Sequence, residues 1–242
     1  MNRSLAIVSL VALLMTPRLA QPKPKGPTKG HAPPCKRLTC VPLTVHLWAA
    51  TTHANTLDPA DQRRAVTHAR RQLAWANKRF AALNVRLVPT SLRWLKPSEK
   101  TIHSGDARDA VGRSRWRRGA VLWVGPRALV DLDGHTVRHG VHWRDRADRR
   151  GELVRKRWVI VTRSRYIFVL AHELGHFFGL PHSRAPLSLM NKHSTPGRPG
   201  VAAWRFTKRE RRRMRSRLQA LRRSGTLRTL RRLPDQPILT TP

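Results

Sequence analysis

Three histidines and one glutamate lie within residues 171–183, in the sequence AHELGHFFGLPHS. His172 and His176 are four residues apart, so on a helix their imidazoles lie on the same face. Two imidazoles placed in this way can bind one metal ion at about 2 Å, the distance that zinc requires. Glu173 lies beside this pair, where its carboxylate can reach a water on the metal without binding the metal itself.

The residues after this helix predict a third metal ligand. Gly179 is typical of a helix C-terminus, and Pro181 prevents the helix from resuming. The chain then turns, so His182 can approach the same ion as His172 and His176. Three protein ligands leave the fourth position of zinc for water, which is typical of catalytic rather than structural zinc sites.

A histidine-rich helix packed in the core is the alternative interpretation. The helix has an apolar stripe formed by Ile167, Leu170, Leu174, Phe177 and Phe178. At about 100° per residue, the His172 and His176 pair projects roughly opposite this stripe. A core histidine would more often lie within the stripe, so the pattern favours a metal site.

The spacing resembles the long zinc signature of the metzincin metallopeptidases. The five matching positions are His172, Glu173, His176, Gly179 and His182. These enzymes also have a methionine turn beneath the zinc, and here the segment SLMN at residues 188–191 places Met190 eight residues after the third histidine. Ser183 and the short spacing to Met190 most resemble the matrixin branch. The resemblance covers residues 43–222.

The resemblance implies an α+β, zincin-like (metzincin) catalytic domain. Its parts are a mixed twisted sheet, a long backing helix, a zinc-binding active-site helix, the methionine turn and a C-terminal helix. It implies a zinc-dependent endopeptidase that acts on proteins or peptides, with one catalytic zinc ion bound by His172, His176 and His182. Glu173 is then the general base for the water that attacks a peptide carbonyl, and Met190 supports the site.

Two further features follow from the same resemblance. The segment TVRHGVHWR at residues 136–144 would pair with the substrate backbone as an added strand. The segment 193–204 would line the pocket beyond the scissile bond. Matrixins often carry a structural zinc and calcium ions, but the spacing of His135, His139 and His142 does not match that pattern. The sequence therefore leaves undecided whether the protein binds additional structural Zn²⁺ or Ca²⁺. DLDG at 131–134 is expected to be a turn.

Hydrophobic periodicity predicts the elements that must position these residues. Strands are expected at 43–49, 85–89, 120–125, 136–144 and 158–162. Asp58 is the expected N-cap of a long amphipathic helix that extends to Phe80. Thr207 and Glu210 form a T-x-x-E capping box, which predicts the closing helix. Residues 96–118 show no clear pattern.

The chain has 242 residues and 40% hydrophobic content, which is enough for one core. Residues 1–20 predict a signal peptide, because Arg3 precedes an apolar run that is too short to span a bilayer with ease. We therefore expect a secreted or periplasmic protein, with an uncleaved membrane anchor as the alternative. Residues 21–42 are expected to form a Pro/Lys-rich linker, residues 43–222 the peptidase domain, and residues 223–242 a basic tail.

Cys35 and Cys40 are the only cysteines. In an exported protein, such a pair is most simply explained by a local disulfide. Two alternatives stay open. One is free thiols; the other comes from the resemblance, since many matrixins stay latent through a propeptide cysteine bound to the zinc. The local sequence PPCKRLTC departs from the motif of that latency switch.

The net charge is +36, from 49 basic and 13 acidic residues. Residues 205–232 contain thirteen arginines or lysines and one acid. Such a surface attracts anionic polymers or acidic proteins, although the sequence contains no specific nucleic-acid motif or stacking platform. A solvated face without a dedicated partner is the alternative, and no oligomeric state is indicated. The competing function is a cationic envelope- or nucleic-acid-binding protein with a structural zinc site, which would not need Glu173.

Overall fold

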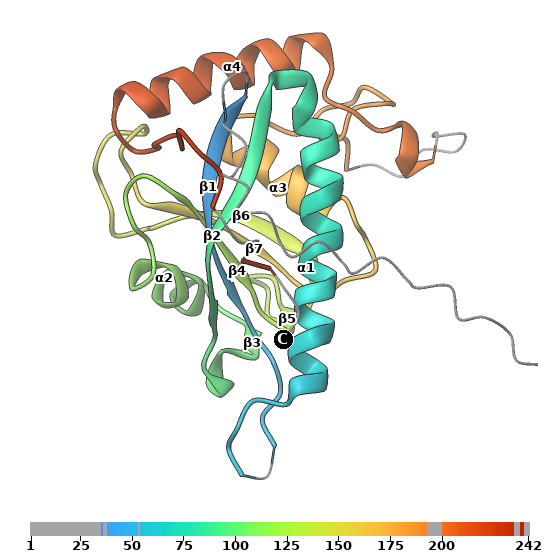
Figure 1. Ribbon diagram of the computed structural model, residues 1–242, viewed down its shortest axis with the longest axis vertical. Coiled ribbons are helices and arrows are strands. Elements are labelled where there is room, and N and C mark those ends of the chain that lie inside the picture. The colour runs from blue at the N-terminus through green and yellow to red at the C-terminus, as the bar shows by residue number, and fades with distance from the viewer. Residues whose placement is uncertain (1–34, 36–37, 53, 193–199, 235–237, 240–242) are drawn as a thin grey trace, which may run out of the picture. The chain divides into compact units, whose positions relative to one another are not determined.

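A five-stranded sheet with the order β2-β1-β4-β7-β6 is the framework of the fold (Figure 1). The computed structural model describes residues 35, 38–52, 54–192, 200–234 and 238–239, so the predicted signal peptide lies outside the described residues. The sheet strands are β1 (Thr39–Leu47), β2 (Val85–Trp94), β4 (Val121–Gly125), β6 (Gly140–Arg144) and β7 (Arg157–Val161). Only the β6–β7 pair is antiparallel, so β6 is an antiparallel edge strand on a parallel sheet.

Four α-helices surround this sheet in the described part of the chain. They are α1 (Pro59–Phe80), α2 (Gly105–Arg113), α3 (Val169–Phe177) and α4 (Lys208–Arg223). Short elements complete the set: η1 (Ala81–Leu83), η2 (Pro97–Glu99), β3 (Thr101–Ile102), β5 (Ala128–Leu129) and η3 (Val201–Ala203). The predicted α+β class, with its long backing helix, active-site helix and closing helix, is confirmed.

The two faces of the sheet have separate cores. Because side chains alternate along a strand, Val45 and Val159 point toward α1 and α3, where they join the larger core. Leu122 and Trp158 point to the opposite face and pack in the smaller core, to which α2 contributes Val111. The active-site helix α3 therefore lies on the α1 side of the sheet.

The start of α1 is fixed by two aspartates. Asp58 is the N-cap, as predicted, and its side chain accepts a hydrogen bond from the backbone N–H of Ala60 at 2.9 Å. Asp61 is buried and accepts two hydrogen bonds from Arg163, at 2.8 and 2.7 Å, and one from the backbone N–H of Ala50. This bidentate ion pair joins α1 to the chain segment between β7 and α3.

Packed elements extend beyond the predicted domain, residues 43–222, at both ends. β1 begins at Thr39, inside the segment that we expected to be linker, because Val41 is fully buried under α1. The segment after Arg223, expected to be a tail, returns to the sheet: Leu227 is buried in the main core, and the N–H of Leu230 donates to the carbonyl of Cys40. These two segments pair with each other, which local periodicity cannot show.

Two internal segments also differ. Residues 96–118 contain β3 and the helix α2, which begins after the N-cap Ser104. The strand expected at 136–144 is shorter, because β6 begins at Gly140 and Val137 forms only an isolated bridge with Val130.

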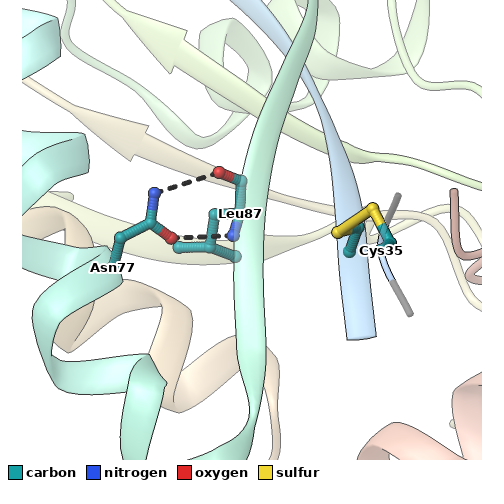
Figure 2. The surroundings of a disulfide bond; sticks show 4 residues. Cys35, Asn77 and Leu87 are labelled. Atoms are coloured by element: carbon teal, nitrogen blue, oxygen red, sulfur yellow. Dashed lines mark hydrogen bonds between the residues drawn. A yellow bond between two sulfur atoms is a disulfide. The ribbon is translucent and has the colours of Figure 1, made fainter. Parts of the chain in front are cut away.

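Cys35 and Cys40 form a disulfide with a Cα–Cα distance of 6.1 Å (Figure 2). Neither cysteine is a free thiol in this structure, so neither is available to bind a metal. Figure 2 also shows Asn77 of α1, whose amide exchanges two hydrogen bonds with the backbone of Leu87 at 3.1 and 2.7 Å. Asn77 thereby joins the backing helix to the edge strand β2. Within the described ranges, no helix has the length and apolar character needed to cross a membrane.

We expect Asp61→Asn to lower the free energy of unfolding by about 3–5 kcal/mol, because Arg163 would be left as a buried, unpaired charge. Urea unfolding followed by circular dichroism measures this loss. The matched control is Asp106→Asn, since the Asp106 side chain is 96% exposed and its ion pair with Arg146 lies at the surface. A parent and an Asp61→Asn variant with equal unfolding midpoints would contradict this role.

The same ion pair predicts a pH dependence. The hydrogen bonds from Arg163 hold the pKa of Asp61 well below its ordinary value. The stability that Asp61 contributes is therefore complete above the unfolded-state pKa of about 3.9, and it is lost as the pH falls through the lower folded-state pKa. Asp61→Asn should lack this part of the acid dependence.

Candidate metal centre

The active-site helix α3 is positioned from its buried face. Leu170 and Leu174 are fully buried in the main core. Gln72 of α1 is also buried, and its side chain accepts from the N–H of Leu170 at 3.1 Å and donates to the carbonyl of Tyr166 at 2.8 Å. Because the first N–H groups of a helix have no partner within the helix, Gln72 acts as a cap supplied by a neighbouring helix.

The end of α3 returns the chain to the site. Gly179 has a φ of +85°, the left-handed conformation that favours glycine at a helix C-terminus. The N–H of Gly179 donates to the backbone carbonyl of His176, and the N–H of Leu180 donates to the backbone carbonyl of Gly175. The helix stops here, as predicted, and the following residues bring His182 back beside His176.

The three predicted ligands come together at one point. Their ligand nitrogens all lie within 4.8 Å of one another. The Nε2 atoms of His176 and His182 are 3.3 Å apart. Two nitrogens at about 2.05 Å from a tetrahedral zinc ion are separated by about 3.3 Å, so this spacing fits the metal. In the part of the chain that the structure describes, no second group of three such side chains occurs.

Backbone carbonyls orient two of the imidazoles. The Nδ1 atom of His172 lies 2.9 Å from the carbonyl oxygen of Leu189, and the Nδ1 atom of His176 lies 2.7 Å from that of Leu180. A carbonyl can only accept, so each Nδ1 carries the proton and each Nε2 keeps its lone pair. This is the tautomer that binds a metal through Nε2.

The methionine turn lies directly beneath α3. Met190 is fully buried, and a Cβ atom added to Gly175 would lie only 2.4 Å from its Sδ atom. The turn is fixed by Ser188, whose hydroxyl accepts from the N–H of Met190 and donates to Glu210. Glu210 is also the capping-box residue of α4, so its carboxylate connects the methionine turn to the closing helix.

Glu173 is buried beside the three histidines but is not a member of the ligand group. Burial raises its pKa to about 8, although a hydrogen bond with the His142 backbone and the charge of Arg138 act in the opposite direction. The backbone of β6 approaches it closely, since a Cβ atom on Gly140 would lie 2.9 Å from the Cγ atom of Glu173. Glu173 therefore lies between α3 and the edge strand, and it lines the same cleft as the three histidines.

A cleft of about 1160 Å³ extends along β6 and α3 and contains all four of these side chains. Its walls come from β6, the end of α3, the segment around Glu152 and the helix α4. The other predicted features lie outside the metal cluster. DLDG is a turn, as expected, in which Asp133 accepts hydrogen bonds from His135 and Thr136. His139 packs against Tyr166, and His142 packs against Phe177.

Comparison with known proteins agrees with this geometry. The sequence model of the matrixin peptidase family matches residues 52–202. Metalloproteinase-II from Bacteroides fragilis has a similar fold, with a TM-score of 0.51 and 14% sequence identity. The match covers 75% of this chain but only 53% of the Bacteroides protein. Archaemetzincin from Methanopyrus kandleri matches at 14% identity with a TM-score of 0.45, over 76% of this chain and 97% of that one. No curated protein sequence matches.

The fold and the family match together define a zinc metallopeptidase of the metzincin class, with zinc as its cofactor. Because the matched segment covers more than half of the chain, the chain belongs to the matrixin family. The branch predicted from Ser183 and Met190 is confirmed.

We expect His182→Ala to weaken zinc binding by at least about a hundredfold. Removal of a residue that only orients a metal ligand already lowers metal affinity about 10–100-fold. His182 would supply a direct bond to the metal, so its loss should cost more. Competition with a chelator measures the affinity. Calorimetry should also show that the unfolding temperature depends on added zinc. The control is His135→Ala, which removes an exposed histidine from the turn at 131–136. Retention of stoichiometric zinc by His182→Ala against a mild chelator would point to another ligand.

Proposed function

We propose that the chain is an exported endopeptidase in which His172, His176 and His182 bind one catalytic zinc ion and Glu173 is the general base. The observation that carries this proposal is the convergence of the three imidazoles and Glu173 in one cleft beside the edge strand β6. A structural site would need no buried carboxylate at this position. The alternative function, a cationic binding protein with a structural zinc site, is therefore less well supported.

An extended peptide can lie along β6. This strand is last in the sheet order, and β7 is its only partner strand in the described sheet. Its outer edge can therefore add a substrate strand through backbone hydrogen bonds. The cleft has lining residues at both ends of β6, from Arg138 to Arg144, so a peptide can extend past the metal site in both directions. This supports internal cleavage rather than removal of terminal residues.

Zinc bound at the three histidines supplies Lewis-acid chemistry, which acidifies water and polarises a carbonyl. Glu173 accepts the proton of the attacking water at a carboxylate oxygen and then donates it to the leaving amine. Gly140 permits this role because a side chain there would collide with Glu173. Leu189 and Leu180 keep the two helix imidazoles in the required tautomer through their carbonyls.

We expect Glu173→Gln to reduce peptide hydrolysis by at least about a hundredfold, the scale of a positioned general base. The amide keeps the shape of the carboxylate but cannot accept the proton. Cleavage of a fluorogenic peptide library measures activity, and metal analysis should show unchanged zinc content. Glu99→Gln is the control, because Glu99 pairs with Arg115 and does not line the cleft. If Glu173→Gln kept most of its activity, another residue would be the base.

Export is the second part of the proposal and is supported by the signal-like sequence at residues 1–20. A disulfide between Cys35 and Cys40 agrees with an oxidising compartment. We expect the protein recovered outside the cytoplasm to begin near residue 21, and intact mass spectrometry measures this. Protein that retains residues 1–20 and fractionates with membranes would support the anchor instead.

The basic surface can bring anionic polymers or acidic proteins to the enzyme. Residues 205–232 include the whole of α4. Met214, Leu218 and Leu221 of this helix are buried, and its arginines are mainly exposed. Attraction through such exposed charges is non-specific and falls with added salt.

A further inference from the structure

The cleft beside the metal site carries more cations than anions. Its basic lining residues are Arg108, Arg138, Arg144, Lys192, Arg213 and Arg217. Its acidic lining residues are Asp131, Glu152 and Glu173. Asp131 pairs with both Arg108 and Arg138 at one end. The positive charge is therefore less balanced at the other end, where β6 finishes and α4 forms the wall.

Three arginines at this end surround one carboxylate, and we call them the guanidinium cluster: Arg144 of β6, Arg157 of β7 and Arg217 of α4. The distances from their terminal nitrogens to the carboxylate of Glu152 are 3.2, 3.8 and 2.8 Å, respectively. Arg144 and Arg157 are directly opposite each other in the β6–β7 pair. Like charges in this position are destabilising, and one carboxylate cannot neutralise three cations.

The cluster also has donors without acceptors. Arg157 is 1% exposed, and both of its terminal nitrogens lack a hydrogen-bond partner among the described residues. The Nε atom of Arg217 lacks one as well. Burial, followed by the charge of Arg217, lowers the pKa of Arg157 to about 10. Buried charged donors normally have acceptors, so the cluster can accommodate a further hydrogen-bond acceptor.

The guanidinium cluster adjoins the metal centre. The stem of Arg217 packs beside Gly179, where an added Cβ atom would lie 3.3 Å from the Arg217 Cγ atom. Gly179 lies between the ligands His176 and His182 in the sequence. On β6, His142 projects from the same face as Arg144, and its ring packs on Phe177 of α3 at 5.9 Å between centroids. A peptide in the cleft would thus pass both the metal site and the cluster.

We propose that the guanidinium cluster is a subsite for a carboxylate side chain of the substrate, so the enzyme selects peptides with Asp or Glu at one fixed position. This inference rests on the proposed peptidase function. Arg144, with 41% of its side chain exposed, and Arg217, with 17% exposed, contact the substrate carboxylate. Arg157 lies behind them and contributes its charge through the wall of the cleft.

The strand geometry gives the position of the selected residue. Gly140 lies against Glu173, and Arg144 is four residues further along β6. At about 3.4 Å per residue, this separation is about 14 Å. A peptide paired with β6 has the same rise, so the acidic side chain should lie about four residues from the scissile bond, on the side toward Arg144.

A peptide series can separate this subsite from the general attraction of a basic protein. Each peptide is otherwise neutral and carries one Glu, which is moved along the sequence so that the net charge stays constant. We expect kcat/KM to be at least about tenfold higher with Glu than with Gln at one position, equivalent to about 1.4 kcal/mol. Equal values at every position would overturn the subsite, while cleavage of the neutral peptide alone would still support the proposed function.

Variants assign the preference to the cluster. Arg144→Gln and Arg217→Gln should each lower the Glu/Gln ratio severalfold. Arg86→Gln is the matched control, because it removes the same charge from an exposed position on β2, at the opposite edge of the sheet. Glu152→Gln removes the competing carboxylate and should raise the ratio. A lower ratio in Glu152→Gln as well would show that the cluster is structural and overturn the proposal.

Binding gives a readout that does not depend on catalysis. Fluorescence anisotropy of the labelled peptides on the zinc-loaded Glu173→Gln variant should give a dissociation constant at least about tenfold lower for the preferred Glu peptide than for its Gln partner. This difference should persist in 0.5 M salt better than the attraction of Glu at other positions, which is screened. Identical dissociation constants would overturn the subsite even if no peptide were cleaved.

Discussion

The contact between Gly175 and Met190 is the constraint on which the geometry of the metal centre depends. Because Gly175 has no side chain, the turn at 188–191 packs against α3 at a distance that any Cβ atom would prevent. This approach places the carbonyl of Leu189 at 2.9 Å from the Nδ1 atom of His172. Gly175 therefore helps to set the tautomer of His172, because its missing side chain allows the turn at 188–191 to pack close to α3.

The backing helix α1 extends this constraint to the sheet. Gln72 caps the start of α3, Asn77 bonds to the backbone of β2, and Asp61 pairs with Arg163 ahead of α3. Three polar side chains on one helix thus fix the active-site helix against the sheet, in addition to the apolar core. Hydrogen bonds and ion pairs are directional, so together these contacts fix the orientation of α3. Burial of Leu170 alone would allow α3 to rotate or shift.

Features that depend on neighbouring residues were predictable from the sequence, and features that depend on distant partners were not. The His172 and His176 pair, the Asp58 cap and the Thr207–Glu210 box each act within one or two helical turns. The helix α2 was missed because buried polar residues hide its periodicity: Arg108 and Asp109 are only 2% and 5% exposed. Arg108 is neutralised by Asp131, and Asp109 accepts a hydrogen bond from the indole of Trp143.

The roles of Asn77 and Gln72 were also not predictable from the sequence, because their hydrogen-bond partners lie on other elements. The C-terminal segment was treated as a tail because its composition is basic, yet Leu227 is buried in the main core and the N–H of Leu230 donates to the carbonyl of Cys40. For Gln72 and Leu227, only the partners on distant segments explain the burial.

The scarcity of carboxylates gives the charge of this protein a structural meaning. Against 49 basic residues there are only 13 acids, and four of the acids that the structure describes, Asp61, Asp109, Asp131 and Glu152, each pair with two or more arginines. Asp61, Asp109 and Asp131 each join separate segments in this way. In the guanidinium cluster, one carboxylate is shared by three arginines, so an anion from outside the chain can supply negative charge that the cluster lacks. At the surface, water and salt screen such charges, and in the cleft beside the metal centre a substrate carboxylate can pair with them.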